Sequence, residues 1–330
     1  DAFHHDLSNS TLLAPRPDGR YLDGTLGLAG HSSALMERAG GHAMLCGLDR
    51  DPQALERAAQ KLAPFGDRCR LFALEYASFA DALDALGWDT VDGALLDIGV
   101  SSLQLDVASR GFSLHDDAPL DMRMDMGSLS APGREPWMQS ARTVVNMADV
   151  NTLRRIIETY GEDPQAPRIA RAIAEARQKA PIETTGQLAD IVWHAYPAKW
   201  RAEARNHPAT RTFQAVRIEV NHELDELKQA LDAAGGLLKP EGRLAVITFH
   251  SLEDRIVKHF FDRAAHPERG LDPRLPLTND MLPKPLFDNI ERIKPSEAEC
   301  EANPRARSAI LRVGVRTVSP WRPEDGACAR

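Results

Sequence analysis

The first hundred residues alternate between strand-like and helix-like segments, and this alternation limits the possible folds more than any other feature. Short apolar runs predict strands, and apolar residues at helical spacing predict helices. The predicted strands are 21–25, 42–48, 70–74 and 91–100, and the predicted helices are 31–39 and 51–62. Strands that alternate with helices form a parallel sheet with helices on both faces. The sequence therefore predicts an α/β fold.

A second, mainly helical domain is predicted to interrupt this sheet. The next clear strand, 243–249, begins about 140 residues after the fourth, far more than a crossover helix and its loops require. Apolar residues recur at helical spacing in 150–160, 169–176 and 188–195. We expect a core formed by residues 1–106 and 207–330, with residues 107–206 as the inserted helical domain for substrate recognition.

Two segments return the chain to the sheet. Residues 208–238 are predicted to form one long helix, whose apolar stripe is interpreted as a packing surface. The members of the stripe are Phe213, Val216, Val220, Leu224, Leu227 and Leu231. Residues 309–315 predict a last strand, added antiparallel at the sheet edge.

Charge and cysteine content narrow the class of protein. The 330 residues carry a net charge of −8, which argues against a wholly basic surface that coats nucleic acid. Arginines do gather locally, at 201–217 and at 305–312. The four cysteines include no C-x-x-C pair, so we expect no zinc site and a reduced, cytoplasmic protein. No signal peptide or bilayer-length apolar run is present, so no membrane association is expected.

A glycine-rich segment follows the first predicted strand and opens a helix. Gly24, Gly27 and Gly30 have the spacing G-x-x-G-x-x-G, which differs from the G-x-G-x-x-G of dinucleotide dehydrogenases. Asp49 ends the second strand, where a carboxylate accepts hydrogen bonds from ribose hydroxyls. The alternative role for Asp49 is a helix N-cap, which Asp51 is equally placed to fill. These features indicate a nucleoside-containing cofactor, and NAD and S-adenosylmethionine both fit them.

Asp97 ends the fourth strand, at the edge of the sheet where ligands bind in open α/β folds. Burying a carboxylate is costly, so an Asp at the end of a buried strand is expected to face a ligand. Asp97 is therefore a candidate for contact with the cofactor or the substrate.

At this point the chain resembles the bacterial family that methylates N4 of a cytidine in small-subunit (16S) ribosomal RNA. The motifs that carry the resemblance include Asp23-Gly24-Thr25, Gly30-His31-Ser32 and Leu96-Asp97-Ile98-Gly99-Val100-Ser101-Ser102. They continue, in the family's order, over nearly the whole chain. The further matching stretches are 49–52, 104–106, 110–113, 119–124, 168–173, 207–215, 217–218, 249–255 and 303–308.

The resemblance implies a class I (Rossmann-like) methyltransferase sheet with an inserted helical domain and S-adenosylmethionine as the cofactor. It implies a substrate cytidine in the decoding region of 16S ribosomal RNA, within the small ribosomal subunit, and it leaves a homodimer open. The residues implied to contact the cofactor are Ala29, Gly30, His31, Asp49, Phe79, Asp97 and Gln104.

Asp97 and His250 are the candidate catalytic residues. A cytosine amine is a poor nucleophile, and a carboxylate that accepts its N–H would localise its lone pair along the line of attack. His250 would bind the ribose or the base, and its alternative role is a structural histidine at a strand end. Candidate substrate contacts are arginines for phosphates, phenylalanines for base stacking and one serine. They are Phe112, Arg211, Phe213, Arg217, Ser251, Arg255, Arg305 and Arg307.

The chain departs from the family's pattern in three places. Ala29 stands where a third glycine is usual, residues 6–13 differ from the usual N-terminal segment, and two prolines within 161–167 are expected to break a helix. The altered segments favour one alternative, a ribosome-assembly protein that keeps the fold but no longer methylates. An NAD-dependent dehydrogenase is a further alternative, which the glycine spacing disfavours.

Overall fold

The computed structural model describes residues 12–100, 102–125 and 136–322. Contacts between Cα atoms divide the chain into two compact units. One, here called the sheet unit, comprises Asp1–Gly99 and Leu224–Arg330, and the other, the helical unit, comprises Val100–Glu223. Residues 6–11 of the atypical N-terminal segment lie outside the described residues.

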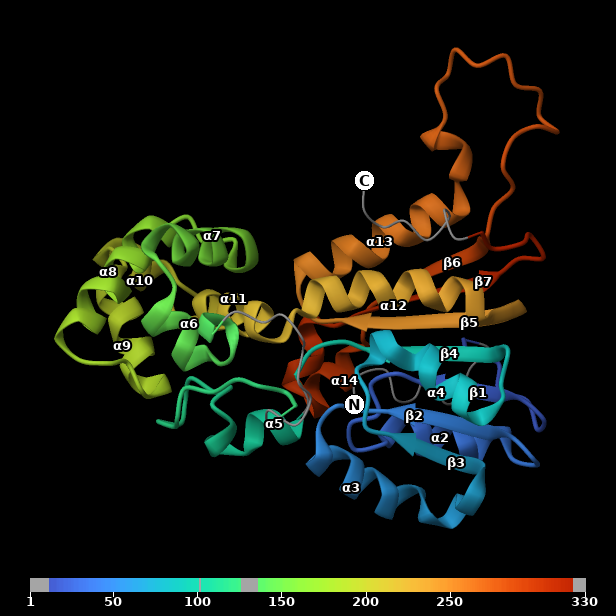
Figure 1. Ribbon diagram of the computed structural model, residues 1–330, viewed down its shortest axis with the longest axis horizontal. Coiled ribbons are helices and arrows are strands. Elements are labelled where there is room, and N and C mark those ends of the chain that lie inside the picture. Colours follow the sequence, from blue (N-terminus) through green and yellow to red (C-terminus); the bar gives the residue numbers. More distant parts are fainter. Residues whose placement is uncertain (1–11, 101, 126–135, 323–330) are drawn as a thin grey trace. The chain divides into compact units, whose positions relative to one another are not determined.

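The sheet unit contains a seven-stranded sheet in the order β3-β2-β1-β4-β5-β7-β6 (Figure 1). The first five strands in this order are parallel, and β7 runs antiparallel to both of its neighbours. This confirms the predicted α/β fold and the class I methyltransferase sheet. The strands are β1 (Arg20–Asp23), β2 (Met44–Leu48), β3 (Cys69–Phe72), β4 (Val91–Asp97), β5 (Leu238–Thr248), β6 (Phe287–Ile293) and β7 (Ile310–Arg316).

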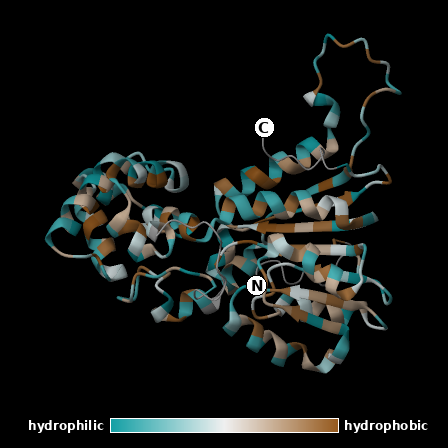
Figure 2. Ribbon diagram, viewed as in Figure 1, coloured by the Kyte–Doolittle hydropathy of each residue, from teal (hydrophilic) through white to brown (hydrophobic). Residues whose placement is uncertain are grey.

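Helices cover both faces of the sheet, because each face carries apolar side chains that must leave water. Figure 2 shows apolar residues gathered along the strands. One hydrophobic cluster joins the sheet to α4, α12 and α13, and a second joins it to α2 and α3. The helices of this unit are α2 (Gly30–Ala39), α3 (Pro52–Leu62), α4 (Phe79–Leu86), α12 (Glu223–Leu237), α13 (Ser251–Ala265) and α14 (Glu297–Ala302).

The helical unit has a hydrophobic core of its own, which includes Ile156, Ile173 and Val192 from the three segments predicted as helices. Its helices are α5 (Ser102–Asp106), α6 (Ala141–Met147), α7 (Val150–Gly161), α8 (Ala166–Lys179), α9 (Thr185–Ala195), α10 (Ala198–Glu203) and α11 (Thr210–Asn221). The predicted break in 161–167 is confirmed, since α7 ends at Gly161 and Glu162 adopts a left-handed backbone with φ 48°.

The single long helix predicted for 208–238 is wrong. The segment forms α11 and α12, which are separated at His222, where φ is 51°. The residues of its apolar stripe are also buried in two separate hydrophobic cores rather than in one. Phe213, Val216 and Val220 are buried in the helical unit, whereas Leu227 and Leu231 are buried in the sheet unit. Helical spacing is the same on both sides of the break, so periodicity alone does not reveal it.

The compact units also have different boundaries from the predicted domains. Residues 100–106 and 207–223 belong to the helical unit rather than to the core. The physical reason lies in α11, which packs against α7 so closely that a Cβ atom added to Gly161 would lie 2.8 Å from the Arg211 carbonyl oxygen. A helix with a buried apolar face stays with the unit that covers that face.

The antiparallel strand near the C-terminus is confirmed, but its predicted place at the edge is wrong. β7 lies between β5 and β6, and β6 forms the edge. β6 is not apparent from the sequence, because Phe287 is its only buried residue and an apolar pattern is almost absent. Charged residues on an edge strand discourage pairing with other chains.

Candidate active site

The parallel strands end at one edge of the sheet (Figure 1), and four polar residues lie at or just after their carboxyl ends. Asp23 ends β1, Asp49 follows β2, Asp97 ends β4 and His250 follows β5. Neighbouring parallel strands end at the same edge, so residues from distant parts of the sequence meet there.

The glycine-rich loop is held by backbone hydrogen bonds to two strands. The Gly24 N–H donates to the Leu95 carbonyl over 3.0 Å, and the Leu26 N–H donates to the Leu48 carbonyl over 2.8 Å. Helix α2 then begins without a side-chain cap, so the N-terminal end of the helix offers polar N–H groups at the sheet edge. Ala29 has the left-handed φ of 58° that favours glycine, which explains why glycine is usual there.

Asp49 ties this loop to the end of β2. Its Oδ2 atom accepts the Gly27 N–H over 2.8 Å, and its Oδ1 atom accepts the Asp51 N–H over 2.8 Å. Burial raises the pKa of the Asp49 carboxyl. The alternative role of helix N-cap falls to Asp51, whose side chain accepts the Gln53 N–H over 3.0 Å. Asp49 is therefore placed beside the glycine loop, as a carboxylate that holds a ribose requires.

Five polar side chains form a cluster between β1, α2 and β4. The buried Asp23 carboxylate accepts the Ser32 hydroxyl over 2.6 Å and the Thr25 N–H over 3.1 Å. His31 Nε2 lies 3.3 Å from Asp97 Oδ2, without the alignment of a hydrogen bond. The Asp97 N–H donates to Thr25 Oγ1 over 2.6 Å. The Asp97 side chain keeps 21% of its surface exposed, so its carboxylate remains accessible to a ligand.

Burial raises the pKa of Asp23 from 3.8 to about 6, although its contacts with Ser32 and His31 oppose the shift. Between pH 4 and 6 the folded chain therefore holds this proton more tightly than the unfolded chain does. The free energy of unfolding then falls as pH rises through this range. At about 1.4 kcal/mol per pKa unit the full effect is about 3 kcal/mol, of which about 2 kcal/mol falls between pH 4 and 6. We therefore expect urea unfolding of Asp23→Asn to depend less on pH than that of the wild type, by about 2 kcal/mol over this range. Parallel stability curves for the two proteins would contradict the shift.

Five of the predicted cofactor contacts are buried, namely Ala29, Gly30, His31, Phe79 and Gln104. Phe79 begins α4 and is fully buried in a core cluster of the sheet unit, so packing already accounts for it. Gln104 is a buried residue of α5 in the helical unit. Ala29, Gly30 and His31 lie where the glycine loop passes into α2. The roles of all five in cofactor binding stay predictions.

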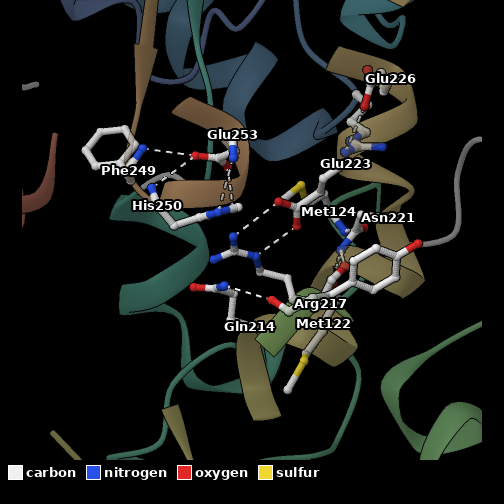
Figure 3. A network of polar contacts seen from close by, with 12 residues as sticks. Met122, Met124, Gln214, Arg217, Asn221, Glu223, Glu226, Phe249, His250 and Glu253 are labelled. Carbon is white, nitrogen blue, oxygen red and sulfur yellow. Dashed lines mark hydrogen bonds and ion pairs between the residues drawn. The ribbon is translucent and has the colours of Figure 1, made fainter. Parts of the chain in front are cut away.

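His250 is the N-cap of α13, and Figure 3 shows the contacts that hold it. Its Nδ1 atom accepts the Glu253 N–H over 3.5 Å, and its Nε2 atom lies 2.9 Å from Glu253 Oε1. Glu253 is fully buried, and its Oε2 atom accepts the Phe249 N–H over 2.9 Å. This capping box favours the structural alternative for His250, and a catalytic role stays a prediction. Sequence reasoning missed Glu253, which the three-residue spacing of a capping box would have revealed.

Several residues predicted to contact the substrate instead contact other residues of the protein or are buried in its core. Arg217 donates to both carboxylate oxygens of Glu223 over 2.8 and 3.1 Å (Figure 3), and Arg211 donates to the Glu162 carbonyl over 2.8 Å. Phe112 and Phe213 keep only 8% and 5% of their surface exposed in the core of the helical unit. Their burial favours packing over base stacking, because a stacked base needs a free ring face.

The remaining predicted contacts lie on the surface of the sheet unit. Ser251 and Arg255 are exposed in the first turns of α13. Arg305 and Arg307 are exposed in the short helical turn Pro304–Ser308. These four residues stay candidates for contact with RNA.

Arg50 is a site residue that sequence reasoning did not single out, although it stands inside the matching stretch 49–52. It is buried beside Asp49, with Nη1 3.4 Å from Glu75 Oε1 and Nη2 3.3 Å from Glu226 Oε2. The guanidinium thus links the turn that carries Asp49 to α12. A buried, paired arginine of this kind orients its neighbours rather than binding phosphate.

Comparison with known proteins identifies the family of the chain. The model of the MraW methylase family matches residues 7–317. The chain belongs to the MraW methylase family. It is 55% identical over 314 residues to the ribosomal RNA small subunit methyltransferase H of Nitratidesulfovibrio vulgaris (strain DSM 19637 / Miyazaki F), covering 94% of this chain and 84% of that one. Membership confirms the predicted resemblance and, with it, a methyltransferase that uses S-adenosylmethionine.

Other relatives bear similar names. The chain is 53% identical over 306 residues to the ribosomal RNA small subunit methyltransferase H of Oleidesulfovibrio alaskensis, covering 92% of this chain and 91% of that one. Among solved structures, an rRNA methylase from Streptococcus thermophilus aligns with a TM-score of 0.40 and 11% identity, covering 95% of this chain and 93% of that one. In the part of the chain that the structure describes, no helix is long and apolar enough to cross a membrane.

Proposed function

We propose that the chain transfers the methyl group of S-adenosylmethionine to N4 of a cytidine in the decoding region of 16S ribosomal RNA. The observation that carries the proposal is the meeting of the glycine loop, Asp49 and Asp97 at one sheet edge in a member of a methylase family. The names of its relatives support small-subunit ribosomal RNA as the substrate. The small ribosomal subunit and the cytoplasm are the setting that this substrate requires.

The residues at the sheet edge fit the cofactor. A Cβ atom added to Gly27 would have only the Thr25 carbonyl oxygen within 4 Å, at 3.9 Å, so the space beside this glycine is open. Gly27 also holds a left-handed φ of 52°. An open backbone turn beside the Asp49 carboxylate suits a nucleoside, whose ribose hydroxyls would bind the carboxylate. When bound, S-adenosylmethionine supplies a methyl group that its sulfonium already activates.

The protein's main task is then to position and to desolvate the reacting amine. The backbone of Asp97 is held by the bond from its N–H to Thr25 Oγ1, and its carboxylate lies beside His31. In the proposed mechanism Asp97 accepts one N–H of the exocyclic amine, localises the nitrogen lone pair and aims it at the methyl carbon. The target base leaves its stack to reach this site.

Exposed polar residues near the end of β5 would hold the RNA around the flipped base. Ser251 and Arg255 follow the strand on α13, and Arg305 and Arg307 precede β7. Their arginines are the candidate phosphate contacts of the sheet unit. His250 would orient Ser251 through its cap on α13.

The test is methyl transfer from labelled S-adenosylmethionine to small ribosomal subunits that lack the modification, followed by nucleoside analysis. We expect label in N4-methylcytidine at a single position. Label in another nucleoside would overturn the proposed specificity and leave the methyltransferase class standing. Cofactor binding without transfer would favour an assembly factor that keeps the fold. A chain that binds no S-adenosylmethionine would refute the assignment of the glycine loop and Asp49.

A further inference from the structure

The helical unit differs from the rest of the chain in its charge. Residues 100–223 contain 15 Lys and Arg against 16 Asp and Glu, whereas the whole chain contains 40 against 48. Almost the entire acidic excess therefore lies in the sheet unit. A local group of cations on the helical unit is not opposed by a strong acidic background, so it attracts polyanions more effectively.

The end of α9 and the following α10 expose two large aromatic side chains. Trp193 keeps 37% and Trp200 keeps 43% of its surface exposed. Exposed tryptophans that lie close together in sequence mark binding surfaces more often than single exposed apolar residues do. Among the described residues, the Trp200 indole has no hydrogen bond and no ring contact. Its N–H and its ring face are therefore available to a ligand.

The Trp193 ring is in contact with two side chains of the same segment. The Arg201 guanidinium lies 5.4 Å from its ring centroid, and the His207 ring lies 5.3 Å from it at an interplanar angle of 36°. A guanidinium at this distance makes a cation–π contact. The stack fixes the segment that presents Trp200 and adds positive charge next to it.

Two further cations flank Trp200. Lys199 and Arg205 are exposed, and neither forms an ion pair with any residue in the described ranges. Glu203 is the only carboxylate in residues 193–207. The other two arginines of the segment 201–217 differ in this respect. Arg211 and Arg217 already bind groups of the helical unit itself. Only the α10 part of this group keeps its charge directed to solvent.

We propose that this surface binds unpaired nucleotides of the ribosomal RNA substrate. The surface, here called the α10 surface, is formed by Trp193, Lys199, Trp200, Arg201, Arg205 and His207. A base stacks on the Trp200 indole, and the Lys199 and Arg205 side chains pair with phosphates. Aromatic rings between unpaired cations are typical of surfaces that bind single-stranded nucleic acid. The proposal rests on the proposed function and adds an RNA contact that lies outside the cytidine site.

The test compares steady-state methyl transfer by the full-length wild type, Trp200→Ala and Trp200→Phe. Stacking on one ring is commonly lost by alanine and kept by another aromatic residue. We expect Trp200→Ala to raise KM for small subunits about tenfold, with kcat at saturation and cofactor affinity unchanged, and we expect Trp200→Phe to restore most of the loss. An unchanged KM for Trp200→Ala, with an unchanged melting temperature, would overturn the proposal.

The cations are tested through the salt dependence of binding to deproteinised 16S RNA. Each lost phosphate contact lowers the slope of log affinity against log salt by about 0.7 for a single strand. The double variant Lys199→Ala/Arg205→Ala is expected to lower this slope by about 1.4. Lys179→Ala, at an exposed lysine at the end of α8, is the control for the loss of one exposed charge outside this surface. Equal slopes for the wild type and the double variant would overturn the proposal, as would a loss confined to intact subunits, which indicates a protein partner.

These outcomes separate the two proposals. If the wild type methylates cytidine while the α10 variants bind RNA normally, the proposal that the α10 surface binds RNA is wrong and the proposed function stands. If the wild type methylates no RNA but its binding to 16S RNA still depends on Trp200, the proposed function fails and the α10 surface stands as an RNA-binding surface.

Discussion

Asp97→Asn is expected to lower kcat for methyl transfer to small ribosomal subunits by about 100-fold or more. General base and positioning groups contribute rate factors of about 100 to 10,000. The asparagine keeps the shape of the side chain but loses the negative charge that would draw the amine N–H. The backbone should remain in place, because Thr25 Oγ1 accepts the N–H of residue 97 rather than its side chain. Single-turnover transfer at saturating cofactor and subunit measures the effect.

Asp92→Asn is the matched control for this variant. Asp92 lies near the opposite end of the same strand, where its carboxylate accepts the Arg20 N–H over 2.9 Å. The substitution makes the same change in charge far from the sheet edge that carries the site, and an amide oxygen still accepts this N–H. We expect its kcat to equal that of the wild type. Full turnover by Asp97→Asn would remove Asp97 from the mechanism and direct attention to a backbone carbonyl.

Asp49→Asn is expected to weaken S-adenosylmethionine binding by roughly 10- to 100-fold. Hydrogen bonds to a charged group contribute about 1.5 to 3 kcal/mol. Both oxygens of Asp49 already accept backbone N–H groups, from Gly27 and Asp51. An asparagine must turn its own NH2 group toward one of these donors, which disturbs the glycine loop as well as the ribose contact. Titration calorimetry with S-adenosylmethionine measures the change.

Asp51→Asn provides the comparison for this second prediction. Asp51 caps α3, and asparagine caps helices about as well as aspartate does. The variant has the same charge as Asp49→Asn and a change only two residues away, so its affinity for the cofactor should stay close to that of the wild type. Equal affinities for all three proteins would show that Asp49 does not hold the ribose.

Much of the sheet unit is predictable because its signals are local. Gly40 and Gly41 end α2, Asp51 and Pro52 begin α3, and the apolar run 93–96 is long enough for a buried strand. Asp49 and Asp97 were found at strand ends for the same reason. Once strands are parallel, the residues that end them meet without further information.

Predictions about single side chains were less accurate where they depended on distant neighbours. Phe213 has the same chemistry as a stacking ring, and only the packing of α11 in the helical unit buries it. Arg217 has the same charge as a phosphate ligand, and only the turn at His222 brings Glu223 to it. The reverse holds for Trp200, whose aromatic side chain resembles a core residue but keeps 43% of its surface exposed in the folded chain.

The sequence by itself determined the first four strands of the sheet with helices α2 and α3, the glycine loop and the placement of Asp49 and Asp97 at strand ends. Periodicity, turn residues and caps act over a few residues, so they can be read along the chain. The tertiary structure alone decided that β6 forms the sheet edge, that α11 and α12 are separate and that the α10 surface stays exposed. These features depend on which distant segment covers an apolar face or pairs with a charge, and burial of this kind is a property of the whole fold.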